Sequence, residues 1–172
     1  MDTTEKAKII IITGTPGVGK STLARFLQKK YGWRRLDLHH YYQNLAIRYN
    51  RKKRCYDLDR KKVLRLVDIK RAEDSTPLII DSHIAHQLPR KLVDICVVLT
   101  CSDLKKLNKR LQRRGYGPAK IRENLDTEIF QVCFEEAGEL GHRVVLFADL
   151  SRKNILARAV KIRQAVKILK SV

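Results

Sequence analysis

The sequence contains little that would support a secreted, membrane-embedded or zinc-binding protein. Its four cysteines include no CxxC pair, and Cys96 lies within an apolar run, so we expect reduced thiols rather than disulfides or a zinc site. No apolar run approaches the roughly twenty residues that cross a bilayer. The apolar stretch near 8–13 is too short for a signal-peptide core and leads into a glycine-rich loop. We therefore expect a cytoplasmic protein without membrane contact, present in the nucleus as well if its source is a eukaryote.

Acidic residues are also scarce. The chain has 37 lysines and arginines against 18 aspartates and glutamates, a net charge of +19. Between Arg34 and Arg71 thirteen basic residues accompany only four acidic ones, so about half of the excess charge lies in one segment. A field of this sign attracts polyanions. The segment is either a solvated insert, with a nuclear import signal at 51–54 in a eukaryote, or a surface that binds RNA. In the second case four tyrosines could stack on unpaired bases: Tyr41, Tyr42, Tyr49 and Tyr56.

The organisation along the chain predicts an α/β fold. Short β-branched runs alternate with longer amphipathic segments, which indicates a mostly parallel sheet of about five strands with helices on both faces. The expected strands lie near 8–13, 33–38, 77–81, 94–100 and 143–148. Ser102 is the expected N-cap of one helix, and the segment 39–58 is expected to contain no strand. Without an internal repeat or low-complexity linker, we expect one domain over residues 1–172.

The stretch "GTPGVGKS", from Gly14 to Ser21, fits the phosphate-loop pattern G-x-x-x-x-G-K-[ST] at every fixed position. It follows an expected strand and opens an expected helix, which is the placement that a P-loop NTPase requires. Lys20 is predicted to reach the β- and γ-phosphates of ATP, Ser21 to offer a hydroxyl to Mg²⁺, and Thr22 to lie near the α-phosphate. The predicted nucleotide-binding residues of the loop are Gly14, Gly17, Val18, Gly19, Lys20, Ser21 and Thr22.

A carboxylate and an imidazole follow the apolar run at 77–80. Asp81 stands where the adjoining strand of such a site holds the Mg²⁺ shell, and with Ser21 it forms the predicted metal site. His83 would share the face of Asp81 if the chain stays extended, because alternate side chains of a strand point the same way. It is then a catalytic residue; otherwise it is a loop histidine with satisfied hydrogen bonds. His86 is expected at the surface.

The stretch "RRGYGPAK" at 113–120 interrupts two expected helices. An arginine-rich loop flanked by Gly115 and Gly117 suits a lid that closes over triphosphate, since phosphoryl transfer needs cations and exclusion of water. Arg114 is the predicted lid arginine, with a solvated helix end as the alternative.

Together these stretches resemble the adenylate kinase isoenzyme 6 family, also called coilin-interacting nuclear ATPase. The resemblance rests on "TGTPGVGKSTL", on "IIDSH", on "YDLD" and above all on "RLQRRGYGPAKIRENLDTEIFQVCFEEA" at 110–137. It covers about 9–160. It implies a Mg²⁺-dependent ATPase that also converts ATP and AMP to two ADP. It further implies a role in small ribosomal subunit maturation, with the platform ribosomal protein of that subunit and rRNA as partners.

The resemblance also implies roles for particular residues. Lys20, Asp81, His83 and Arg114 match catalytic positions, and Lys153 matches, less closely, a residue of the base pocket. The acceptor-nucleotide insert would span about 37–60 and the lid about 113–123. Ribosomal RNA would contact the basic segment 48–62, and a monomer is expected.

The chain departs from the family at one position that bears on the acceptor. Where members usually present an arginine toward the monophosphate, this sequence has Gln43, which carries no charge; Arg48 is about one helical turn away. Three hypotheses therefore stay open. The protein is an ATPase with adenylate kinase activity, an assembly factor that switches with nucleotide state, or a kinase of another small metabolite or nucleoside monophosphate.

Overall fold

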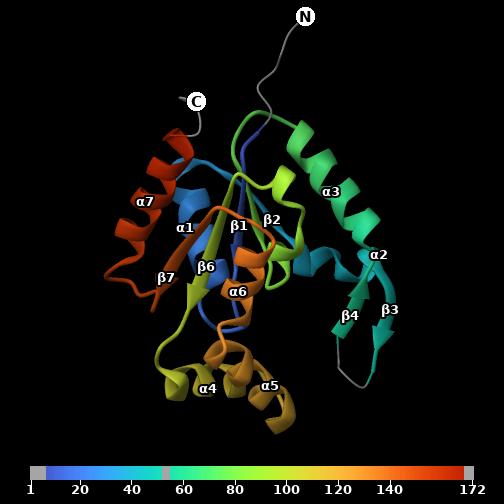
Figure 1. Ribbon diagram of the computed structural model, residues 1–172, viewed down its shortest axis with the longest axis vertical. Helices are drawn as coiled ribbons and strands as arrows, with labels where there is room; N and C mark the ends of the chain where they lie inside the picture. The colour runs from blue at the N-terminus through green and yellow to red at the C-terminus, as the bar shows by residue number, and fades with distance from the viewer. Residues whose placement is uncertain (1–6, 52–54, 169–172) are drawn as a thin grey trace, which may run out of the picture.

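A computed structural model describes residues 7–51 and 55–168 of the chain. Five parallel strands form one sheet in the order β2-β5-β1-β6-β7, and helices cover both of its faces (Figure 1). The predicted α/β architecture is therefore confirmed. Each expected strand lies within two residues of its predicted position, because continuous apolar runs are typical of strands buried on both faces.

The elements follow one another along the chain as the alternating pattern predicts. The sheet consists of β1 (Ile9–Thr13), β2 (Arg34–Asp37), β5 (Leu78–Asp81), β6 (Ile95–Thr100) and β7 (Val144–Ala148). The α-helices are α1 (Lys20–Tyr31), α2 (Tyr42–Leu45), α3 (Arg60–Ala72), α4 (Leu104–Arg113), α5 (Pro118–Ile129), α6 (Val132–Glu139) and α7 (Ile155–Ile168). Three short 3₁₀ turns are η1 (Leu38–Tyr41), η2 (Ala85–Gln87) and η3 (Arg90–Leu92).

The two faces of the sheet form two separate apolar clusters. In β1, Ile10 and Ile12 point toward α1, α4 and α7, whereas Ile9 and Ile11 point toward α2, α3 and α6. Figure 1 shows α1 and α7 side by side along one flank and α3 on the opposite flank. Helices α4 and α5 lie beyond the carboxyl ends of the strands, which is the edge where parallel α/β sheets bind ligands. No helix in the described part of the chain is both long and apolar enough to cross a membrane.

Two expectations about local structure were wrong. The segment 39–58 does contain strands: β3 (Ala46–Asn50) and β4 (Cys55–Leu58) form an antiparallel hairpin that projects from the sheet (Figure 1). The N-cap of α4 is Asp103 rather than Ser102, because the Asp103 carboxylate accepts from the Lys106 amide at 2.8 Å. Residues 52–54, which hold most of the expected import signal, lie outside the described residues.

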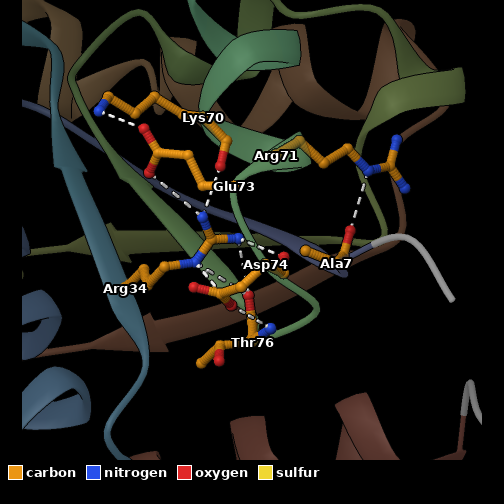
Figure 2. A network of polar contacts seen from close by, with 7 residues as sticks. All are labelled: Ala7, Arg34, Lys70, Arg71, Glu73, Asp74 and Thr76. Carbon is orange, nitrogen blue, oxygen red and sulfur yellow. Dashed lines mark hydrogen bonds and ion pairs between the residues drawn. The ribbon is translucent and has the colours of Figure 1, made fainter. Parts of the chain in front are cut away.

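Part of the basic charge is neutralised by contacts within the fold. Figure 2 shows the guanidinium of Arg34 on β2 donating to the carbonyl oxygens of Lys70 and Asp74, at 2.5 and 2.9 Å. It also lies 3.5 Å from the Glu73 carboxylate and 3.2 Å from that of Asp74. Since the orphan carbonyls at a helix end need donors, Arg34 fixes the end of α3 to the edge of the sheet. This arginine is therefore a structural residue and is not free to bind a polyanion.

Candidate phosphoryl-transfer site

The loop between β1 and α1 has the backbone that its glycines allow. Gly14 has a φ of 130°, and a Cβ placed there would lie 2.2 Å from the Leu99 carbonyl oxygen. Gly19 has a φ of 113° and is the N-cap residue of α1, with its carbonyl accepting from the amides of Thr22 and Leu23. The φ values of 130° and 113°, together with such close backbone approach, favour glycine over any residue with a Cβ. The sequence motif therefore produces the tight curl in which backbone amides can surround a phosphate.

Helix α1 presents an anion-binding end to this loop. Its first turn contains no acidic residue, and no side chain caps it. The unsatisfied amides and the positive end of the helix dipole favour a phosphate at this place. Arg110 on α4, which is half-buried, donates to the Gly17 carbonyl at 3.0 Å and so braces the loop from the lid side.

Lys20 folds back onto its own loop. Its ammonium donates to the carbonyls of Gly14 and Thr15, at 2.7 and 3.0 Å. Burial lowers the pKa of Lys20 to about 8; the Asp81 carboxylate opposes this shift and the Arg114 charge adds to it. Three of the four predicted catalytic residues, Lys20, Asp81 and Arg114, thus interact electrostatically, and Lys20 carries its charge at neutral pH.

Asp81 ends β5 with only 2% of its surface exposed. Its Oδ2 accepts from both Nη2 and Nε of Arg35, at 2.6 and 3.2 Å, and Arg35 also contacts Asp37. Asp81 Oδ1 has no hydrogen-bond partner among the described residues, and the protein does not fully enclose this oxygen. One carboxylate oxygen and the Ser21 hydroxyl are hard oxygen donors of the kind Mg²⁺ prefers, so the residues present fit that ion. No cluster of three or more metal-binding side chains occurs within residues 7–51 and 55–168.

His83 lies beside Tyr42, which belongs to the segment 37–60 that is predicted to be the acceptor insert. Its Nδ1 is 3.4 Å from the Tyr42 hydroxyl, which bonds the Ser82 hydroxyl at 2.9 Å. His83 is an exposed residue, yet desolvation by the surrounding protein, followed by repulsion from Lys20, lowers the pKa of His83 to about 4. The imidazole is therefore neutral at pH 7, and its Nε2 has no hydrogen-bond partner in the described ranges.

His86 is buried, so the expectation of a surface residue was wrong. It is 3% exposed, and its ring joins the Thr13 hydroxyl, 2.8 Å from Nδ1, to the Glu136 carboxylate, 2.7 Å from Nε2. Burial lowers the pKa of His86, although Glu136 opposes the shift. In a neutral ring Nε2 donates to Glu136, and the Thr13 hydroxyl shares its proton between His86 Nδ1 and the His83 carbonyl oxygen, 3.1 Å away. This chain of contacts ties the residue before the phosphate loop to α6.

The remaining predicted ATP contacts differ in how they are placed. Arg114 is the C-cap residue of α4 and is exposed, with Lys20 within electrostatic reach. Lys153 is exposed in the turn after β7. Val18 is 1% exposed and packs in the core, so only its backbone could meet a phosphate. A surface hollow of about 450 Å³ lies between α4 and α5, and no residue of the phosphate loop lines it.

Neither of the two residues considered for the acceptor monophosphate offers an unpaired charge. Gln43 is exposed on α2. Arg48 on β3 pairs with Asp57 of β4 at 2.7 Å. Tyr42 is only 8% exposed, so it is not available to stack on RNA, and among the described tyrosines of the insert Tyr49 is the most open, at 49%.

Three residues of the site escaped the sequence reasoning: Arg35, Tyr42 as a partner of His83, and Arg110 as a brace of the loop. Arg35 and Asp81 are 46 positions apart and meet only through the pairing of β2 with β5. No local motif marks such a contact.

Comparisons with known proteins bear on the family and the fold of the chain. The family model described as "AAA domain" matches residues 10–131. An adenylate kinase isoenzyme 6 homolog of Caenorhabditis elegans is 35% identical over 79% of this chain and 75% of its own. The Schizosaccharomyces pombe homolog is 38% identical over 76% of this chain and 74% of its own. A gluconokinase from Sinorhizobium meliloti superposes with a TM-score of 0.56 at 17% identity, covering 94% of this chain and 97% of its own, which shows the fold alone.

Proposed function

Because this chain belongs to the adenylate kinase isoenzyme 6 family, and is thus a phosphotransferase, we propose that it transfers the γ-phosphoryl group of ATP to AMP and, more slowly, to water. The observation that carries the proposal is the meeting of the phosphate loop, Asp81 and His83 at one edge of the sheet, with Arg114 in electrostatic reach of Lys20. Catalysis of phosphoryl transfer is largely a matter of placing cations and reactants in this way.

Each residue has a separate task in this proposal. The amides of the loop and of the first turn of α1 bind the phosphates, and Lys20 releases its two loop carbonyls to reach them. Arg114 stabilises the charge that develops on the transferred group. Ser21 and Asp81 Oδ1 would hold Mg²⁺, which when bound neutralises phosphate charge.

His83 serves hydrolysis as an orienting residue. A general base works best with a pKa near the working pH, and a pKa of about 4 makes the ring a weak base at pH 7. The neutral Nε2 can still accept a hydrogen bond from an attacking water. Tyr42 fixes the ring from the other nitrogen, so the acceptor insert sets the direction in which the water is held.

Product analysis tests the proposal and separates its rivals. Purified protein is incubated with ATP and Mg²⁺, with and without AMP, and ADP is counted against inorganic phosphate. ADP in excess of phosphate on adding AMP marks the kinase, whereas equal amounts mark hydrolysis. The control is Lys161→Ala, an exposed lysine of α7, beside Lys20→Ala. A panel of acceptor substrates that reveals a faster acceptor than AMP would favour a kinase of another metabolite. The uncharged Gln43 is compatible with that alternative, because it cannot supply the charge that usually faces the monophosphate.

We also propose a role in small ribosomal subunit maturation, with the platform ribosomal protein and rRNA as partners and the basic segment 48–62 as the RNA contact. Four free thiols are in keeping with a cytoplasmic or nuclear setting. Support comes from the exposed cations Arg51, Arg60, Lys61 and Lys62, which form no ion pair with any described residue.

The RNA contact has a matched test. Neutralising Arg51, Lys52, Lys53 and Arg54 together should weaken binding to single-stranded RNA and lower the salt slope by about 3. The control carries the same charge change on α1 and α7, at Lys29, Lys30, Lys161 and Lys167, all exposed. Equal losses in both variants would mean that binding follows net charge and not segment 48–62. Failure of the immobilised protein to retain the ribosomal protein in any nucleotide state would refute that partner.

A further inference from the structure

The carboxylates of Asp37 and Asp81 stand side by side at the site. They are partners in the register of β2 and β5, and neighbouring strands lie only about 4.8 Å apart. Their side chains are 19% and 2% exposed. Like charges placed opposite each other in a sheet repel, and water screens such buried groups poorly. A positively charged group is therefore needed to hold the two carboxylates together.

Arg35 does this from the same strand as Asp37. The two residues are alternate positions of β2, so their side chains share a face, and the Arg35 side chain is 13% exposed. Its Nη2 lies 2.6 Å from Asp37 Oδ2 and 2.6 Å from Asp81 Oδ2, and its Nε adds the contact of 3.2 Å. A planar guanidinium can bridge two carboxylates in this way, whereas an ammonium cannot reproduce the geometry.

The contacts also select one oxygen of Asp81. Both Arg35 donors bind Oδ2, which leaves Oδ1 as the oxygen that is open to a ligand in the described structure. We propose that Arg35 is a positioning residue that fixes the rotation of the Asp81 carboxylate, so that Oδ1 is presented to the nucleotide-bound Mg²⁺. The inference rests on the proposed nucleotide site and adds to it a residue that touches neither nucleotide nor metal.

Arg34, the residue before Arg35 in the sequence, provides a matched control. Arg34 is equally a half-buried arginine of β2 with several acceptors, but it points to the end of α3 and contacts neither Asp37 nor Asp81 (Figure 2). Arg34→Gln and Arg35→Gln remove the same charge, and Arg34→Gln removes more hydrogen bonds than Arg35→Gln, which makes it a demanding control. Only the second change affects Asp81.

The experiment measures binding of a non-hydrolysable ATP analogue by calorimetry, once with Mg²⁺ and once with EDTA. For each protein the readout is the ratio of the two affinities, which a general loss of stability does not change. We expect Arg35→Gln to reduce this Mg²⁺-dependent gain about tenfold while the affinity in EDTA stays within twofold. Arg35→Lys should show an intermediate loss, and Arg34→Gln should keep the full gain.

The outcomes are separable. If the analogue does not bind the unmodified protein, the proposed function fails. The positioning role is overturned, while the nucleotide site stands, in either of two cases. In the first, Arg35→Gln and Arg35→Lys both retain the Mg²⁺-dependent gain in affinity of the unmodified protein. In the second, Arg34→Gln loses this gain as much as the Arg35 variants do. Should Arg35→Gln not fold, Arg35→Lys alone decides. The double variant Arg35→Gln/Asp37→Asn should regain part of the lost thermal stability, because the carboxylate repulsion is gone, without regaining the Mg²⁺-dependent gain.

Discussion

The lowered pKa of Lys20 makes nucleotide affinity sensitive to alkaline pH. Desolvation holds this pKa at about 8, against an ordinary value of 10.5. Phosphates favour the charged ammonium, so a complex formed above pH 8 must take up a proton. Affinity should therefore fall as the pH rises through 8, whereas a lysine with an ordinary pKa would show no change until about pH 10.

The size of the effect follows from the titration. With a pKa of about 8, roughly 90% of Lys20 is protonated at pH 7 and roughly 10% at pH 9. If the neutral form contributes little, the dissociation constant rises about tenfold over this interval, or ~1.4 kcal/mol. The phosphates add no comparable change, since they ionise near pH 6.

Calorimetric titration of the ATP analogue from pH 7 to pH 9, in buffers of equal ionic strength, measures this dependence. Lys20→Arg keeps a charge at every pH and should give a flat profile, although binding is weaker overall. Lys161→Met, which changes an exposed lysine of α7, should keep the wild-type profile. A dissociation constant that stays constant in the unmodified protein would refute the assigned pKa and the role of the charged form.

Three further predictions concern the loop and the two histidines. Gly14→Ala should lower the free energy of unfolding by at least about 2 kcal/mol in a denaturant titration, because its Cβ would meet the Leu99 carbonyl; Gly138→Ala, with open space around it, should be neutral or stabilising. His83→Ala should leave the dissociation constant of ATP unchanged and slow hydrolysis 10- to 100-fold in steady-state kinetics; equal loss of both would make His83 structural. Since the folded state lowers the pKa of His86, stability should fall as the pH drops below about 6.5, and His86→Gln should reduce that fall; an unchanged pH dependence would count against the neutral buried ring.

The fold could be predicted because its signals are local. Each central strand is an uninterrupted apolar run, and the phosphate loop is one continuous stretch from Gly14 to Ser21. The hairpin was missed because β3 and β4 are short and partly exposed, without the alternation that marks a half-buried strand. Its stability comes from cross-strand pairs that only the register reveals: Tyr49 with Tyr56, at 4.9 Å between ring centroids, and Arg48 with Asp57.

The site was predictable in its phosphate-binding half and not in its supporting contacts. His86 was expected at the surface, yet Glu136, fifty positions later, packs over it. In the same way the charge of Arg35 counted toward a basic surface, although two carboxylates take it up inside the fold. Charge totals therefore overstate what segment 34–71 offers to a polyanion.

A crystal structure with a non-hydrolysable ATP analogue and Mg²⁺ tests the central claim most directly. The account predicts the triphosphate against the amides of residues 14–21, with Lys20 Nζ moved from the Gly14 and Thr15 carbonyls to the β- and γ-phosphate oxygens. It also predicts Asp81 Oδ1 facing the metal while Oδ2 stays on Arg35. An analogue bound elsewhere, or a loop that still holds Lys20 on its own carbonyls beside an ordered nucleotide, would contradict it.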